Sequence, residues 1–467
     1  MGKHFISVLG IGKYNAVYYG EDEEPTCFIQ EAILRQKVGS LEPDDRISIF
    51  VTEESLKKNY EPADDRAGLK NTLIRNLGVR EEQLQAVIIP VGKNEAELQE
   101  IFNRMYDEIR DGEHLFVDIT HSLRNIPVQA LAALTFARVV KNITIEGVYY
   151  GAFEVRDVAA ERAPIFELTS FLDIIDWAHA ANSFKRYGSS EELRDLSKEY
   201  NIRMHKGVHS KEQIKEAELL NSLSSALVKI TRSIATARGC YDKDRNAGED
   251  YSVMQAYKGY VRKRDHYLEF ANAREDKTAS PLNKLVSVID QKARPFDKRC
   301  NLEIGIETVK WSIENNMTQQ GFTALEETIK TYLCNRYELD ETQRCDREQI
   351  CKGVCNCLNE VNIGNQEERE AREKAFEKWK RRFEGVGQED RTEVALTVTE
   401  KKIAIAERMV NELSPEFIHL CANLSSSRNS LNHFGFAQIG EYSWKKLDET
   451  LKKYFDEFMG FYNNHAV

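Results

Sequence analysis

The segment HLFVDITHSLRNIP, which spans His114–Pro127, decides the fold of the first third of this 467-residue chain. It begins with an apolar run typical of a strand buried on both faces, and it ends with a proline that suits the first turn of a helix. Apolar residues from Val128 to Val140 then recur at helical spacing. The polar patch Asp118–Asn125 is therefore predicted to be the loop between the carboxyl end of a strand and the amino end of a helix.

The patch Asp118–Asn125 has the chemistry of an anion-binding loop. In open parallel sheets, ligands bind at the carboxyl ends of the strands, and the start of a helix offers free N–H groups and a positive dipole end. The patch adds side-chain donors from Thr120, His121, Ser122 and Arg124. We expect an anionic ligand such as a phosphate. The alternative is an ordinary strand-to-helix turn in which Asp118 and Thr120 cap the helix.

Strand-like and helix-like segments alternate through the first 168 residues. The strand-like runs are Phe5–Leu9, Ile47–Val51, Ala86–Val91, Leu115–Ile119 and Ile143–Tyr150. The helix-like segments between the first four runs are Phe28–Leu34, Ala67–Leu77 and Glu95–Ile109. Strands separated by helices predict a parallel sheet with right-handed crossovers, so residues 1–168 are predicted to form a Rossmann-like α/β domain.

Small or polar loops follow the predicted strands, and such loops meet at one edge of a parallel sheet. They contribute further residues expected to line a ligand pocket: Gly10, Gly12, Lys13, Tyr14, Asn15, Thr52, Gly92 and Asn125. The first loop is not a G-x-G-x-x-G dinucleotide fingerprint, because Asn15 stands where the third glycine is needed. A Rossmann-type oxidoreductase is therefore only a distant alternative.

The pattern D-I-T-H-x-x-R-N-x-P at Asp118–Pro127 resembles the signature of CRISPR-associated Rossmann fold (CARF) sensor domains of type III CRISPR systems. The family usually reads T-H-G-F-R, whereas this chain has Ser122 and Leu123. The G-x-G-x-Y loop at Gly10–Tyr14 and the Y-Y-G-A sequence at Tyr149–Ala152 extend the resemblance over most of the domain. The resemblance implies that the ligand is a cyclic oligoadenylate, expected to be the four-membered ring. It places four residues nearest the phosphates: Thr120, His121, Arg124 and Asn125.

The rest of the chain is predicted to be helical. Phe171–Tyr187 resembles the connector helix that follows the sensor in this family, and apolar residues repeat at helical spacing beyond residue 206, as at Leu220, Leu223 and Leu227. The predicted organisation is thus a sensor domain at 1–168, a helical connector at 169–205 and an all-α domain at 206–467.

A second motif lies near the C-terminus, where Arg428-Asn429-x-x-x-His433 is predicted to be helical. It resembles the active-site motif of HEPN (higher eukaryotes and prokaryotes nucleotide-binding) ribonucleases. At 100° per residue, Arg428 and His433 point about 140° apart, while Asn429 lies one turn from His433 and can orient its imidazole. In the family, two such helices meet across a two-fold axis and pool their residues, so the resemblance implies a homodimer or a higher homo-oligomer.

These residue types suit cleavage of single-stranded RNA without a metal. Transesterification needs a base for the 2′-hydroxyl proton, an acid for the leaving 5′-oxygen and positive charge on the phosphate. His433 can exchange the protons and Arg428 can grip the phosphate, giving 2′,3′-cyclic phosphate and 5′-hydroxyl ends. The alternatives are that both are ordinary surface residues, or that the chain is a non-catalytic ligand-sensing regulator whose helical half contacts protein or DNA.

The net charge and the distribution of apolar residues argue against some classes of function. The formal net charge of −11 argues against a broad basic surface for long nucleic acid, so RNA must meet a local positive pocket. No apolar stretch of 18 residues occurs, and Met1–Gly10 has the pattern of a strand and not of a signal peptide. We therefore expect a cytoplasmic location and no membrane partner.

Five of the nine cysteines fall within 24 residues: Cys334, Cys345, Cys351, Cys355 and Cys357. Their C-x5-C-x3-C-x-C spacing does not match the C-x2-C pairs of common zinc sites, and Cys351 and Cys355 are one helical turn apart. Buried or incidental thiols are therefore favoured over a zinc site. We expect neither a metal nor a resident cofactor.

Overall fold

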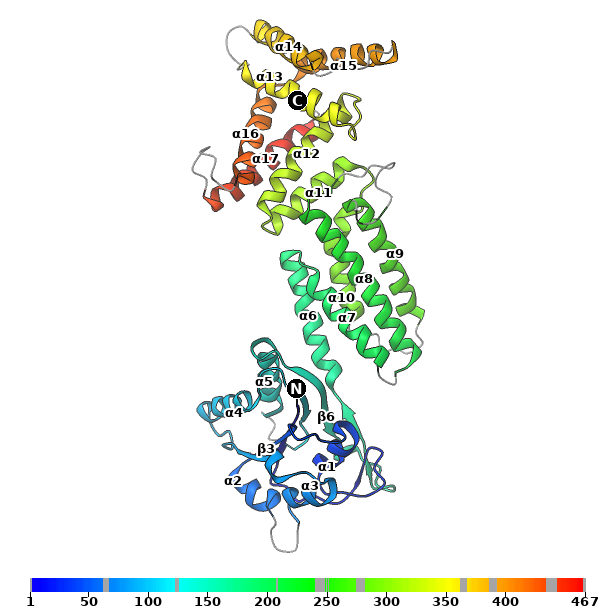
Figure 1. Cartoon of the computed structure of the whole chain (residues 1–467), viewed down its shortest axis with the longest axis vertical. Helices are drawn as coiled ribbons and strands as arrows, with labels where there is room; N and C mark the ends of the chain where they lie inside the picture. Colours follow the sequence, from blue (N-terminus) through cyan, green and yellow to red (C-terminus); the bar gives the residue numbers. More distant parts are fainter. Residues whose placement is uncertain are drawn as a thin grey trace. The chain divides into compact units, whose positions relative to one another are not determined.

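The computed structural model describes most of the chain, namely residues 2–61, 67–121, 126–206, 209–239, 248, 250, 252–273, 282–361, 368–385, 393–433 and 443–464. Only the backbone is described for 385 and 393–398. The chain divides into two compact units, Met1–Ile175 and Asp176–Val467 (Figure 1). Every helix within the described ranges is too short or too polar to traverse a lipid bilayer.

The N-terminal unit is built on a six-stranded sheet with the order β4-β3-β1-β5-β6-β8. The strands are β1 (Lys3–Leu9), β3 (Arg46–Val51), β4 (Leu84–Ile88), β5 (His114–Asp118), β6 (Thr144–Gly151) and β8 (Ile165–Glu167). All neighbouring pairs are parallel except β6 and β8. The five predicted strands are confirmed. Their order is that of a Rossmann half-sheet, with the direction of winding reversing between β1 and β5.

One edge of the sheet differs from the predicted parallel arrangement. The three-residue β8 pairs antiparallel with β6, so that Tyr150 lies opposite Phe166. A separate two-stranded ladder joins β2 (Tyr18–Tyr19) to β7 (Arg162–Ala163). Strands of two or three residues are too short to show a period of two in the sequence, so these pairings depend on contacts between distant segments.

Helices cover both faces of this sheet (Figure 1). They are α1 (Ile29–Ile33), α2 (Glu53–Ser55), α3 (Leu69–Leu77), α4 (Glu95–Glu108) and α5 (Ile126–Val140), with short 3₁₀- or π-helical turns η1 (Leu34–Val38), η2 (Leu56–Tyr60), η3 (Glu81–Gln83) and η4 (Phe153–Val155). Successive side chains of β1 point to opposite faces of the sheet and so contribute to two separate hydrophobic cores. Phe5 and Leu9 pack on the side of α1 and α3, whereas Ile6 and Val8 pack on the side of α4 and α5. The three predicted helices are confirmed.

Helix α6 (Thr169–Tyr187) contains the division between the two units. Leu172 and Ile175 in its first half belong to the core beside α5. Trp177 and Phe184, which follow the division, belong to a core of the C-terminal unit. The predicted connector is therefore helical, and it continues into α7 (Glu191–Lys206).

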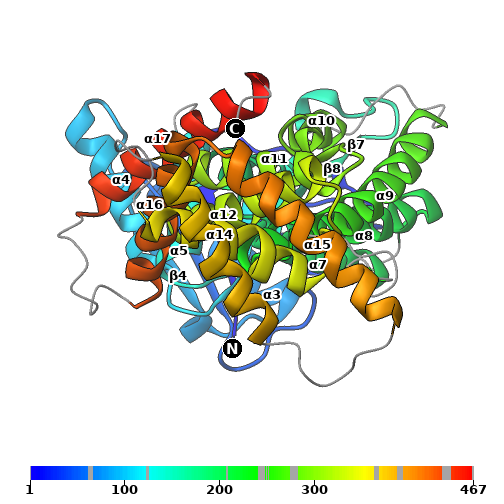
Figure 2. The ribbon, with the colours of Figure 1, turned by 90° about the horizontal axis from the view of Figure 1, so that it is seen from above.

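The described part of the C-terminal unit consists of helices and their connecting loops. Its further helices are α8 (Lys211–Ala235), α9 (Val253–Ala273), α10 (Leu282–Ala293), η5 (Arg294–Phe296), α11 (Asn301–Glu314), α12 (Thr318–Arg336), η6 (Cys345–Lys352), α13 (Gly353–Glu360), α14 (Glu368–Gly385), α15 (Glu393–Glu412), α16 (Pro415–Asn432) and α17 (Trp444–Asn464). One core lies among α6 to α11 and a second among α11 to α17. Figure 2 shows α14 and α15 side by side. Trp379 of α14 is fully buried in the second core.

The clustered cysteines lie mainly in this second core. Cys334, Cys351, Cys355 and Cys357 are buried, as predicted, and Cys345 is half-buried. The Sγ atoms of Cys334 and Cys351 are 3.6 Å apart, and both thiols are free. In the part of the chain that the structure describes, no three histidine, cysteine or acidic side chains converge as metal ligands would.

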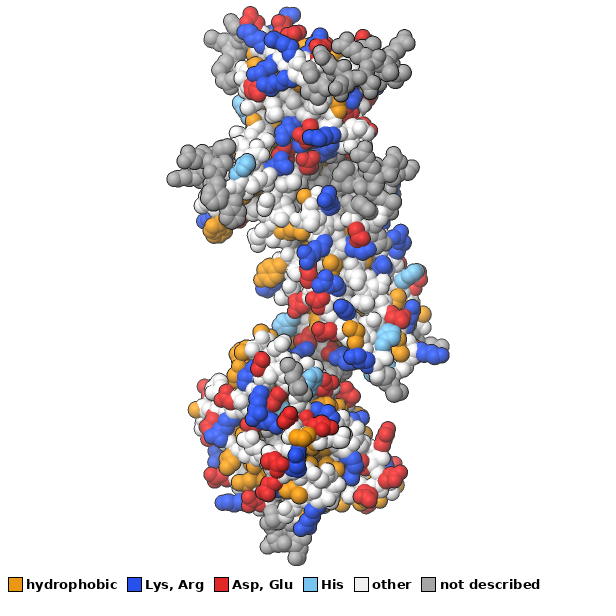
Figure 3. Space-filling model, in the orientation of Figure 1, with side chains coloured by type: hydrophobic (Ala, Val, Ile, Leu, Met, Phe, Trp, Pro, Cys, Tyr) orange, Lys and Arg blue, Asp and Glu red, His pale blue; other side chains and the backbone are white. Residues whose placement is uncertain are grey.

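Charged side chains of both signs are mixed over the surface that Figure 3 shows. This mixing fits the net charge of −11, because an acidic chain has no excess of lysine and arginine from which to build a broad basic face.

Candidate functional site

A pocket of about 330 Å³ opens at the carboxyl edge of the sheet, where the winding direction changes between β1 and β5. Loops after β1, β3, β4 and β5 form it. The structure brings six of the predicted ligand-binding residues to this pocket: Gly10, Gly12, Tyr14, Thr52, Thr120 and His121. Apolar side chains, among them Val8, Ile89 and Ile126, complete the lining.

Asp118, also predicted to bind the ligand, is not among the residues that line this pocket, and the remaining predicted residues fall into two groups. Lys13 and Asn15 are exposed on the first loop beside the lining residues, and Gly92 follows Val91, which lines the pocket. Gly92 has a φ of 83°, a left-handed conformation that favours glycine. Three more residues lie outside the described part of the chain: Ser122, Arg124 and Asn125.

Asp118 supports the pocket loop from within the protein. Its side chain is buried, and it accepts hydrogen bonds from Ser7 Oγ at 2.7 Å, Thr120 N at 2.9 Å and Thr120 Oγ1 at 2.6 Å. Burial raises the pKa of Asp118, although these donors act in the opposite direction. Thr120 Oγ1 in turn accepts from the backbone N–H of Gly151 at 2.8 Å. Asp118 therefore fixes the start of the loop that follows β5, and Thr120 and His121 in this loop line the pocket.

The glycine loop after β1 is held by a residue that sequence reasoning missed. Asn59, in η2, donates its side-chain amide to the backbone oxygens of Gly10 at 2.8 Å and Gly12 at 3.0 Å. Thr52 caps the short helix α2, because its Oγ1 accepts from the N–H of Ser55 at 3.2 Å. Nothing in the local pattern marks Asn59, since its partners lie almost fifty positions earlier.

Tyr14 and His121 meet across the pocket. Their ring centroids are 4.4 Å apart with an interplanar angle of 42°. Tyr14 Oη and His121 Nε2 are both buried and have no hydrogen-bond partner among the described residues. Burial lowers the pKa of His121, while the charges of Asp118 and Glu154 act against this shift. A buried polar atom without a partner costs about 1–3 kcal/mol, so both atoms are suited to bind a polar ligand.

The second candidate site lies on α16, which confirms the predicted helix around Arg428. Asn429 is exposed, and the helix ends at Asn432, so that exposed His433 is its C-terminal capping residue. The N–H of His433 donates to the carbonyl of Asn429 at 3.0 Å. Arg428 is less accessible, because its side chain is only 25% exposed and its Nε is buried without a partner in the described chain.

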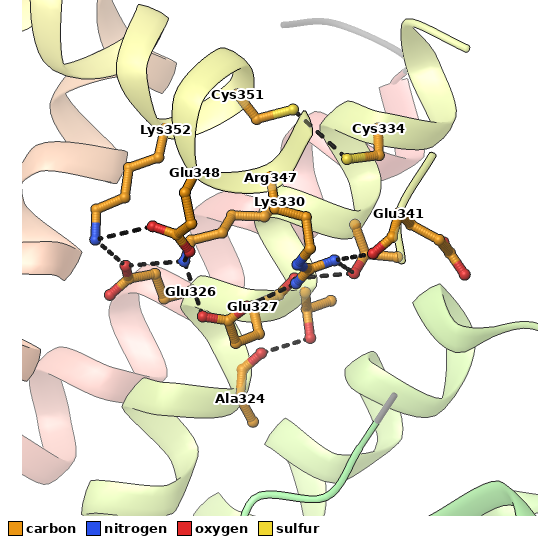
Figure 4. Close-up of polar contacts among 12 residues, drawn as sticks. Ala324, Glu326, Glu327, Lys330, Cys334, Glu341, Arg347, Glu348, Cys351 and Lys352 are labelled. Atoms are coloured by element: carbon orange, nitrogen blue, oxygen red, sulfur yellow. Dashed lines mark hydrogen bonds and ion pairs between the residues drawn. The ribbon is translucent and has the colours of Figure 1, made fainter. Parts of the chain in front are cut away.

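Arg428 is held by a carboxylate that sequence reasoning did not single out. Its Nη1 lies 3.3 Å from Glu326 Oε2 on α12. The Glu326 side chain is 8% exposed, and it also accepts from Lys352 Nζ at 2.9 Å and lies 3.5 Å from Lys330 Nζ (Figure 4). One nearly buried carboxylate therefore faces three cations. The separation of 102 positions between Glu326 and Arg428 explains why no local signal reveals the pair.

Further ion pairs stabilise the charges around Glu326. Lys330 contacts Glu327 at 2.8 Å and Glu348 at 2.5 Å, and Arg347 contacts Glu327 at 2.7 Å (Figure 4). Burial alone would lower the pKa of Lys330, but the neighbouring carboxylates together raise it. The ammonium group of Lys330 is therefore stabilised by its partners in spite of its burial. Glu348 and Arg347 come from η6, a π-helical segment of the kind often found at functional sites.

Helix α12 also anchors the end of α16. Gln319 Nε2 donates to Asn432 Oδ1 at 3.3 Å, and the preceding residue, Thr318, bonds to Asp448 of α17. The C-terminal end of α16, with His433, thus lies beside the first turns of α12 and α17. This arrangement offers a guanidinium for binding phosphate and an exposed imidazole for proton transfer, on one helix whose ends are fixed.

No family model matches the chain. The chain is similar to the CRISPR-associated protein MJ1674 of Methanocaldococcus jannaschii, with 23% identity over 271 residues. The match covers 57% of this chain and 36% of that protein, so the chain spans little more than a third of its relative's length. This likeness supports a distant relationship between the chain and a CRISPR-associated protein.

Proposed function

We propose that the chain is an endoribonuclease of type III CRISPR antiviral defence that cyclic oligoadenylate activates and that needs no metal. The observation that carries the proposal is the pocket at the β1/β5 switch point, which gathers residues from both CARF-like loops. The Arg428–His433 motif in the C-terminal unit supports the enzyme class, because it resembles the HEPN motif. The distant likeness to MJ1674 supports the CRISPR setting.

The proposed reaction is an internal transesterification. An imidazole of one His433 takes the proton of the RNA 2′-hydroxyl, and the 2′-oxygen then attacks the adjacent phosphorus. The bond from phosphorus to the 5′-oxygen breaks, and a second, protonated His433 gives its proton to that oxygen. Arg428 binds the phosphate, whose negative charge increases in the transition state. The products carry 2′,3′-cyclic phosphate and 5′-hydroxyl ends, and the two histidines come from two subunits.

A chelator-containing ribonuclease assay tests this function. Single-stranded RNA should be cut slowly by the protein alone and much faster when one cyclic oligoadenylate is added from a panel of linear and cyclic forms. Cleavage should persist in excess EDTA, and the products should carry the ends described above. Equal cleavage with and without the ring, or cleavage that requires magnesium, would contradict the mechanism.

The proposed homodimer has a candidate surface on α5. This 15-residue helix has one charged side chain, Arg138, and it exposes an apolar stripe that includes Val128, Leu131 and Val139. A two-fold dimer places the same patch of each copy against the other, so an uncharged patch avoids repulsion between like charges. Such a stripe on the sensor unit fits a partner that is a second copy of the chain.

The substitution Val139→Glu should weaken this dimer by a factor of about ten or more, because it places two unpaired carboxylates in a buried interface. Val139 is 84% exposed, so the fold of the single chain should tolerate the change. The matched control is Val158→Glu, because Val158 is similarly exposed but lies in a turn outside α5. Sedimentation equilibrium measures both dissociation constants. Equal dimer affinity in the two variants would exclude α5 as the interface.

A further inference from the structure

One tryptophan differs from the other three in its environment. Trp177, Trp311 and Trp379 are buried in the helical cores, whereas Trp444 is 77% exposed. A tryptophan supplies a large rigid ring with little entropy to lose, and it is therefore common where proteins bind other molecules. The exposed indole of Trp444 is available to a ligand, and no part of the proposed mechanism described above uses it.

The sequence around Trp444 adds positive charge. Trp444 is the first residue of α17, and the exposed Lys445 and Lys446 follow it directly. Ser443 fixes this start of the helix, because its Oγ accepts from the N–H of Lys446 at 3.3 Å. An exposed aromatic ring beside cationic side chains is the combination with which proteins bind single-stranded nucleic acid, the ring stacking on a base and the cations meeting phosphates.

The structure also places the start of α17 near the end of the candidate catalytic helix. Asp448, one helical turn after Trp444, bonds to Thr318, and the adjacent Gln319 bonds to Asn432, the neighbour of His433. Two successive residues of α12 thus hold the start of α17 and the end of α16 together. Since one turn of helix is only about 5.4 Å long, Trp444 and His433 lie within the reach of a short RNA segment.

We propose that Trp444 is a stacking platform for an unpaired RNA base close to the cleaved bond, with Lys445 and Lys446 facing the flanking phosphates. This inference rests on the proposed ribonuclease function and names its substrate class more closely. Stacking requires a base that is free of a duplex, so the platform selects single-stranded over double-stranded RNA. It also acts on any base, because every base has a flat face, and it therefore gives little sequence preference.

The test is a binding titration with the His433→Ala variant, which is expected to bind RNA without cutting it. A single-stranded oligouridylate is added while tryptophan emission is recorded, and acrylamide quenching reports the exposed indole. RNA should quench the emission of Trp444 and protect it from acrylamide. In the same background, Trp444→Ala should weaken binding about 5- to 100-fold, whereas Trp444→Tyr should retain most of the affinity. Tyr187→Ala removes another exposed aromatic, from α6, and should have no effect.

Several results would overturn the proposal. Trp444→Ala could bind RNA as tightly as its parent, or a duplex of the same length could bind as well as the single strand. If Trp444→Ala turned a dimer into monomers, the indole would belong to an interface between copies. The two proposals can fail separately. If RNA quenches the emission of Trp444 but the wild-type protein never cuts it, only the ribonuclease function is wrong. If the wild-type protein cuts RNA but Trp444→Ala leaves the RNA affinity unaltered, only the platform is wrong.

Discussion

Replacing His433 by alanine should lower activated RNA cleavage by about 10²- to 10⁴-fold, the range that a positioned proton-transfer group typically contributes. His433 is exposed at the end of α16, so its side chain adds little to the packing of the unit. The free energy of unfolding should therefore change by no more than about 0.5 kcal/mol. Initial rates at saturating activator, together with a urea unfolding curve, measure both quantities.

The matched control for this substitution is His419→Ala. His419 is also exposed on α16, but it lies fourteen positions before His433 and outside the motif. This variant should cleave RNA at the wild-type rate. Full activity in His433→Ala would show that the motif is not catalytic, and the chain would then fit a sensor that regulates a protein or DNA partner through its helical half.

The second large effect is expected for Glu326→Gln, which keeps the shape of the side chain and removes its charge. Arg428 would lose a charge-assisted hydrogen bond to a nearly buried carboxylate, and such bonds contribute about 1.5–3 kcal/mol. A guanidinium that is no longer held in place positions the phosphate poorly. Cleavage should therefore fall about 10- to 100-fold, and the free energy of unfolding should fall by about 1–3 kcal/mol.

The substitution Glu327→Gln tests whether Glu326 affects cleavage by positioning Arg428 or only by stabilising the fold. Glu327 also lies on α12, but it forms its ion pairs with Lys330 and Arg347, whereas Glu326 faces Arg428. Burial alone would raise the pKa of Glu327, yet these two cations lower it, so its charge also stabilises the fold. Glu327→Gln should lose similar stability while retaining most of the activity. Equal loss of activity in both variants would mean that Glu326 only stabilises the unit.

The five longer strands and the longer helices of the N-terminal unit could be predicted from local pattern, whereas the short strands β2, β7 and β8 could not. Apolar runs such as Ile47–Val51 are long enough to indicate a strand that is buried on both faces of the sheet. Apolar residues spaced three and four positions apart indicate the helix α4. The parallel pairing of the strands followed from the alternation of these segments, whereas their order in the sheet came only from the structure. Because the loops after parallel strands share one edge, the sequence also predicted that Gly10 and Thr120 would meet at a pocket, although they lie far apart in the chain.

The sequence by itself thus determined the α/β and helical division, the strands of the parallel sheet and the loops that line its pocket, because each depends on short-range periodicity. Only the tertiary structure decided that Asn59 holds the glycine loop, that Glu326 faces Arg428, and that Trp444 alone among the tryptophans is exposed. These properties depend on which distant segments pack together. Burial and charge pairing are set by the three-dimensional neighbours of a side chain, and its neighbours in the sequence do not reveal them.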